Sequence, residues 1–181
     1  MRQHREILSA KSGTHMKKSS TITEREVSAQ LAEELNKMIA AGGTPFEKAT
    51  VEHRAGNQYP DITIWRDYSN RQAFAFWELK APNRHEDISK LPSKAKSLEV
   101  EHAVVWNFQH GTLYKIKDNK IDILRSYPVP ILNSLNDWTM KSKRIAAIEQ
   151  ARIILGDLTR LANDGSLRDR LAFLLPRQPT H

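Results

Sequence analysis

The 181-residue sequence contains no cysteine, which excludes disulfide bonds, thiolate nucleophiles and cysteine-based zinc sites. It has no apolar run approaching the length of a membrane span, and residues 1–20 lack the apolar segment of a secretory signal. It also lacks the GxxxxGK(S/T) loop of ATP-driven enzymes and the N/D-P-P-Y/F motif of adenine methyltransferases. These absences fit a protein of the reducing cytoplasm, without a membrane partner.

Basic residues outnumber acidic ones, with 28 Lys and Arg against 21 Asp and Glu and a net charge of +7. This balance favours a polyanionic partner such as DNA, although many basic domains have no such partner. The length suits one domain with its own hydrophobic core and a terminal extension.

The segment Tyr59–Pro82 contains two strand-like stretches joined by a short polar loop. Side chains alternate between the faces of a strand, so the second stretch should present on one face Phe74, Phe76, Glu78 and Lys80. An antiparallel hairpin would bring Asp61, at the start of the first stretch, beside Glu78 and Lys80. The sequence therefore predicts two carboxylates and a lysine at one end of a hairpin.

Two carboxylates close together are typical of a site for a hard divalent cation such as Mg²⁺. A lysine beside them could orient a water on the metal or help to deprotonate it. The alternative is an edge strand whose Glu78–Lys80 pair faces solvent, because an E-x-K pattern is short and common.

Pro60-Asp61 followed by Glu78-Leu79-Lys80 resembles the PD-(D/E)XK motif of the restriction-endonuclease-like phosphodiesterase superfamily. The resemblance implies an α/β fold with an αβββαβ core, in which helices flank a mixed central sheet. It also implies that Asp61 and Glu78 bind Mg²⁺, with Mn²⁺ as a substitute. The main-chain carbonyl of Leu79 would be a further ligand, and Lys80 would be the catalytic lysine.

A helix should begin near Thr21 or Thr23, since each has an acidic residue three positions later in a capping-box pattern. Apolar residues then recur at helical spacing up to a stop at residues 40–43. Glu24 lies near this apolar stripe, and the superfamily resemblance makes it our candidate for a metal ligand on the first helix. Alternatively, Glu24 only complements the positive end of the helix dipole.

A first strand is expected at Lys48–His53, where Glu52 would lie across the pair from Asp61. Glu52 is a candidate metal ligand or water-positioning base, and the alternative is a glutamate that faces solvent. After the hairpin we expect an irregular helix at Glu86–Glu99, despite Pro92. Basic residues crowd this part of the chain and are candidates for DNA contacts, with an ordinary solvated surface as the alternative: Arg84, Lys90, Lys94 and Lys96.

Three further strands are expected at residues 103–108, 112–116 and 121–124. These strands make the resemblance to the superfamily more specific, because Asn107-Phe108 and Leu113-Tyr114 follow the E-x-K motif. This order is similar to that of the N-terminal nuclease domains fused to N6-adenine DNA methyltransferases in single-chain restriction–modification enzymes. It implies a prokaryotic, cytoplasmic protein with DNA as its substrate and a methyltransferase domain or subunit as partner. Because cutting both DNA strands takes two active sites, a homodimer is also expected.

The remaining sequence is helical from Ser134, with an expected break at Asn163–Gly165 and a second helix at Leu167–Leu175. We therefore divide the chain into a flexible basic segment (1–20), a nuclease core (21–130) and a C-terminal helical extension or connector (131–181). Packing of the extension within the same domain is the simpler alternative. The predicted function is a metal-dependent deoxyribonuclease, with a catalytically silent DNA-binding or assembly module, or a resolvase or repair nuclease, as alternatives.

Overall fold

The structure, a computed structural model, describes residues 21–51 and 60–174, with side chains up to residue 165. Glu52 and the expected basic segment at 1–20 thus lie outside the described residues. The elements in chain order are α1 (Glu24–Ala40), β1 (Lys48–Val51), β2 (Ile62–Asp67), β3 (Gln72–Leu79), η1 (Ile88–Lys90), α2 (Leu91–Leu98), β4 (His102–Trp106), β5 (Gly111–Lys117), β6 (Lys120–Tyr127), η2 (Leu135–Thr139) and α3 (Lys141–Leu174).

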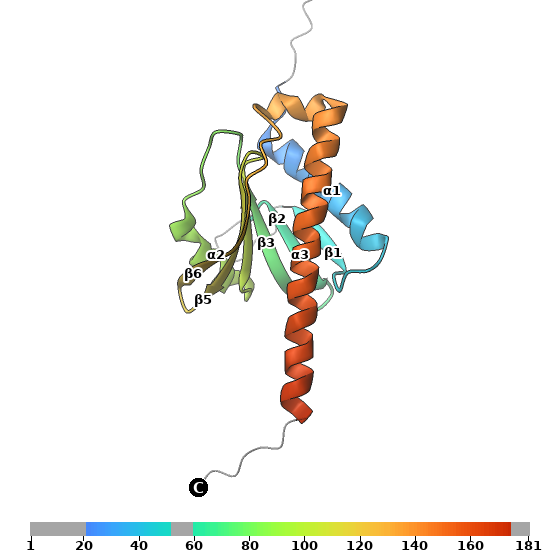
Figure 1. The fold of residues 1–181 in the computed structure, drawn as a ribbon, viewed down its shortest axis with the longest axis vertical. Helices are drawn as coiled ribbons and strands as arrows, with labels where there is room; N and C mark the ends of the chain where they lie inside the picture. Colours follow the sequence, from blue (N-terminus) through green and yellow to red (C-terminus); the bar gives the residue numbers. More distant parts are fainter. Residues whose placement is uncertain (1–20, 52–59, 175–181) are drawn as a thin grey trace, which may run out of the picture.

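The strands form one mixed sheet in the order β1-β2-β3-β4-β5-β6. Every neighbouring pair is antiparallel except β3 and β4, which are parallel. A parallel pair requires a crossover connection, and the segment containing η1 and α2 supplies it. In the described residues the architecture is thus mixed α/β, with a six-stranded sheet and three α-helices. Figure 1 shows how these elements are arranged.

Helix α1 begins with the expected capping box, formed at Thr23. The Thr23 hydroxyl accepts a hydrogen bond from the Glu26 N–H (3.2 Å), and the Glu26 carboxylate accepts one from the Thr23 N–H (2.8 Å). These bonds satisfy main-chain donors that a helix start leaves free. They fix where the first turn begins, and with it the position of Glu24.

Hydrophobic residues pack on both faces of the sheet. One cluster joins α1 and α3 to the sheet and includes Leu31, Trp77, Trp106, Ala151 and Leu158. A smaller cluster joins α2 to the other face and includes Phe76, Leu91, Ala95 and Tyr114. Figure 1 shows α1 and α3 on one side of the sheet and α2 on the other.

The first part of α3 therefore belongs to the same hydrophobic core as the sheet, as in the simpler of our two expectations. The predicted break at Asn163–Gly165 is wrong, because α3 continues to Leu174. A single helical glycine costs about 1 kcal/mol, which a long helix tolerates. Within the described residues, no helix is long and apolar enough to span a membrane.

Two further local expectations were wrong. Phe74 belongs to the cluster on the α1 side rather than sharing a face with Phe76, because the β2–β3 register shifts beside it. The helix expected at Glu86–Glu99 is shorter, since α2 begins only at Leu91. Pro92 then lies in the first turn, where a missing N–H costs nothing.

His102, at the start of β4, stacks on the displaced Phe74 with ring centroids 4.8 Å apart. Burial lowers the pKa of His102 to about 4, Glu101 partly opposes this shift, and Lys115 and Arg66 add to it. Since the ordinary pKa is 6.5, the unfolded chain binds more protons than the folded one between these two values.

We therefore expect folding stability to fall as the pH is lowered from about 6.5 to about 4. In His102→Phe, which keeps an aromatic ring beside Phe74, this loss should be smaller by roughly 1–3 kcal/mol. Urea unfolding at a series of pH values measures it, with a variant of the exposed His85 as control. An identical pH dependence of wild type and His102→Phe would contradict the prediction.

Candidate active site

The hairpin of β2 and β3 brings Asp61 to the C-terminal end of β3. Ile62 pairs with Trp77 in the antiparallel register, and Asp61 Oδ2 accepts a hydrogen bond of 2.7 Å from the Leu79 N–H. Burial raises the pKa of Asp61, while this hydrogen bond and the charges of Lys80 and Lys94 oppose the shift. Asp61 thus lies beside the strand end that carries the other two motif residues.

Glu78 lies on the face of the sheet that α2 covers and is only 2% exposed. Its Oε1 forms a 2.7 Å ion pair with Nζ of Lys94. Burial raises the pKa of Glu78 to about 7, Lys94 opposes the shift, and the charges of Asp61 and Glu86 add to it. The environment of Glu78 thus holds its proton more strongly than that of an exposed glutamate.

Lys80 follows β3 directly, and its Nζ forms a 2.8 Å ion pair with Glu86. Burial alone would lower the pKa of Lys80, but the hydrogen bond to Glu86 and the charges of Asp61 and Glu78 together raise it. Lys80 is thus held beside Glu86 and close to the carboxylates of Asp61 and Glu78. A cation in this place can orient a water or stabilise negative charge.

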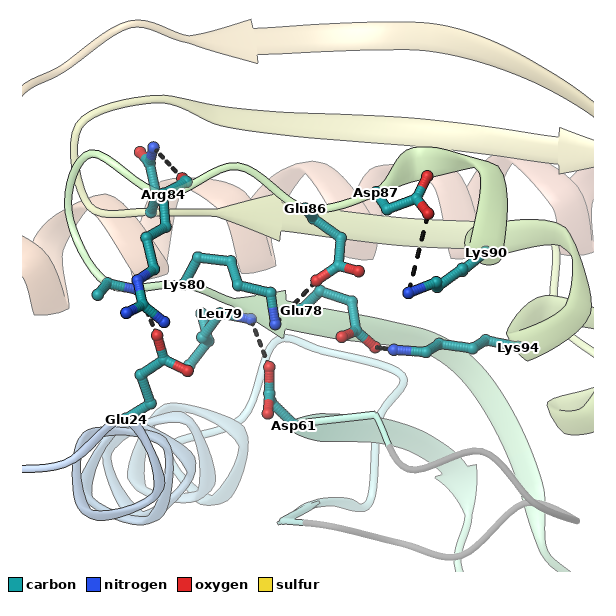
Figure 2. A network of polar contacts seen from close by, with 12 residues as sticks. Glu24, Asp61, Glu78, Leu79, Lys80, Arg84, Glu86, Asp87, Lys90 and Lys94 are labelled. Carbon is teal, nitrogen blue, oxygen red and sulfur yellow. Dashed lines mark hydrogen bonds and ion pairs between the residues drawn. The ribbon is translucent and has the colours of Figure 1, made fainter.

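Glu24, in the first turn of α1, reaches across to the same strand end. Its Oε1 accepts a hydrogen bond of 2.7 Å from the N–H of Ala81, the second residue after β3. Its charge also contributes to the raised pKa of Asp61. The structure therefore places Glu24 at the edge of the cluster, as well as at the positive end of the helix dipole (Figure 2).

The sequence reasoning missed Glu86, and it assigned Lys94 to the wrong environment. Lys94 was expected on a basic surface, but it is 9% exposed and its charge is paired inside the protein. The helical spacing in the sequence did indicate burial, because Lys94 falls in the same stripe as Leu91, Ala95 and Leu98. Nothing comparable marks Glu86, which lies in the irregular segment before η1.

Asn107 positions the segment that carries Glu86. Its Nδ2 donates a 2.9 Å hydrogen bond to the Arg84 carbonyl, and its Oδ1 accepts hydrogen bonds from the N–H groups of Gln109 and His110. The side chain is buried, so these bonds tie the loop after β3 to the turn after β4.

The other basic candidates do lie on the surface. Arg84, Lys90 and Lys96 are exposed, and Lys90 is 3.8 Å from Asp87. Figure 2 shows Arg84 and Lys90 in the same view as the carboxylate cluster. Glu52 is not among the described residues, so its expected position across from Asp61 stays a prediction.

The donor atoms of this cluster suit a hard divalent cation. Four carboxylates (Glu24, Asp61, Glu78 and Glu86) lie around two ammonium groups (Lys80 and Lys94), and none of the six residues is fully exposed. In the part of the chain that the structure describes, no three His, Cys, Asp or Glu side chains form a ready-made metal site. Asp61 and Glu78 could supply the one or two carboxylates that Mg²⁺ takes beside main-chain oxygen and water.

No family model and no curated protein matches this sequence. Among solved structures, the chain is similar to the type IIG restriction endonuclease BpuSI, with a TM-score of 0.51 and 12% sequence identity. The fold is restriction-endonuclease-like. The match covers 74% of this chain but only 16% of the BpuSI chain, and at this identity the likeness concerns the fold alone.

The geometry predicts that Glu86 raises the pKa of Lys80. In Glu86→Gln, the burial of Lys80 is no longer offset by this partner, so the pKa of Lys80 should fall. An NMR titration of the lysine side-chain signals measures the shift. Glu34→Gln, which removes a partner of the exposed Lys37, is the matched control and should leave Lys80 unchanged. An unaltered Lys80 pKa in Glu86→Gln would count against the proposed arrangement.

Proposed function

We propose that this chain is a Mg²⁺-dependent DNA endonuclease domain that hydrolyses phosphodiester bonds in a restriction–modification or related DNA-defence system. One observation carries the proposal: Asp61, Glu78 and Lys80, which form the PD-(D/E)XK pattern, come together at one end of β3 in a restriction-endonuclease-like fold. The succession of α1, β1, β2, β3, α2 and β4 supports it, because these elements follow one another as in the αβββαβ core.

Asp61, Glu78 and the main-chain carbonyl of Leu79 would hold the Mg²⁺ or Mn²⁺ ion, with Glu24 and Glu52 as further candidates. When bound, the ion supplies stabilisation of negative charge on the phosphate and a water that is nucleophilic near neutral pH. The chain's own carboxylates would position this ion beside the scissile phosphate.

Lys80 would act as a fixed positive charge. Its ion pair with Glu86 holds the ammonium group in place and keeps the proton on Nζ. From there it would donate hydrogen bonds to the attacking water or to a phosphate oxygen, where negative charge increases in the transition state. The catalytic role assigned to Lys80 is therefore orientation and charge stabilisation.

DNA would approach the surface beside this cluster. Arg84, Lys90 and Lys96 are exposed in the segment that follows β3, and exposed cations of this kind bind phosphates with a strong dependence on salt. A methyltransferase domain or subunit, and a second copy of the chain to cut the opposite strand, are the partners that we propose on the motif order and on the chemistry of double-strand cleavage.

A second candidate function, a catalytically silent DNA-binding module, has one observation in its favour. Lys94 provides a positive charge 2.7 Å from Glu78, and this charge partly neutralises the carboxylate that a metal would need. In that case DNA binding would depend on salt but be indifferent to Mg²⁺.

For the endonuclease, we expect plasmid cleavage with Mg²⁺ to fall by at least about a hundredfold in Glu78→Gln and in Lys80→Met. Both changes remove a charge at the reacting site while keeping the side-chain length. Glu33→Gln, at an exposed glutamate of α1, is the control and should cleave like wild type.

Equal cleavage by wild type and Glu78→Gln would refute the assignment of the site. Mg²⁺-independent DNA binding without cleavage would instead favour the silent module.

A further inference from the structure

Lys94 lies where a helix normally carries an apolar residue. It is part of the stripe that α2 packs against the sheet, between Leu91 and Leu98, and its side chain is 11% exposed. Placing an ammonium group there removes it from water, which costs free energy unless an opposite charge compensates. The free-energy cost of this burial therefore depends on which charged group the ammonium group contacts.

That partner is Glu78, on the central strand β3. Nζ of Lys94 is 2.7 Å from Oε1 of this buried carboxylate. Figure 2 shows Lys94 approaching Glu78 from the side opposite Asp61. Lys80 is arranged differently, because its ion pair is with Glu86. Of these two lysines, Lys94 is thus the one whose ion pair engages a proposed metal carboxylate.

We propose that Lys94 is the internal counter-ion of Glu78 in the metal-free protein, and that it competes with the divalent cation for this carboxylate. The inference rests on the proposed function, since it concerns the same site. Two cations that share one carboxylate repel each other strongly in a buried environment. Binding of the metal would therefore displace the Lys94 ammonium group from Glu78, while Lys80 stays with Glu86.

The test is the affinity for Mn²⁺ and for Mg²⁺, measured by calorimetry on the full chain without DNA. Lys94→Met keeps the length of the side chain and removes the competing charge, so we expect at least about tenfold tighter binding of both ions. Lys94→Arg keeps the charge and should bind like wild type. Lys37→Met is the matched control, because Lys37 is also ion-paired on a helix but is 59% exposed.

Thermal unfolding gives a second readout that does not depend on cleavage. Without metal, Lys94→Met leaves Glu78 buried without its partner, and its Tm should be lower than that of wild type by several degrees, on the order of 4–10 °C. Added Mn²⁺ should raise the Tm of Lys94→Met more than that of wild type, because the ion replaces the missing charge.

The outcomes separate this inference from the proposed function. Equal or weaker metal binding by Lys94→Met, with wild-type binding that Asp61→Asn abolishes, would overturn the competition but leave the metal site intact. Lack of binding by every variant would overturn both. If Lys94→Met does not fold, the wild type still decides: Mg²⁺ should shift the NMR signal of the Lys94 side chain, and an unchanged signal at saturating Mg²⁺ would refute displacement.

Discussion

The arrangement of the site depends on one buried charge, the Glu78 carboxylate at the end of the central strand. A carboxylate that is 2% exposed must be protonated, paired or bound to a cation. The raised pKa of Glu78, which favours its neutral form, and its ion pair with Lys94 both reduce the free-energy cost of burying this carboxyl. Helix α2, which hydrophobic residues pack over this face of the sheet, supplies the partner through the lysine in its apolar stripe.

The features that short-range sequence patterns control could be predicted. The capping-box patterns placed the start of α1 near Thr21 or Thr23, and the structure forms the box at Thr23. The alternating residues and polar loop of the hairpin placed Asp61 beside the end of β3. Both depend on residues near each other in sequence and on regular geometry. The prediction that Asp61, Glu78 and Lys80 lie close together therefore needed only the antiparallel pairing of the two strands.

Features that depend on packing between distant elements could not be predicted in the same way. The register shift beside Phe74 moved this ring to the other face of the sheet, and an alternation rule contains no information about such a shift. Glu86 became part of the site only through the fold of an irregular segment, which Asn107 holds from another strand. For Lys94 the charge suggested a surface residue, whereas its position in the helix indicated burial. The structure buries it.

The order of the elements also has a consequence for how the protein is made. The described site residues lie between Glu24 and Lys94, whereas α3, which completes the core on one face, begins only at Lys141. Synthesis proceeds from the N-terminus at about 5–20 residues per second, so the hairpin and its charges leave the ribosome seconds before this helix. For that interval only α1 is available to cover this face of the nascent sheet, so the apolar side chains that later pack against α3 remain exposed to water.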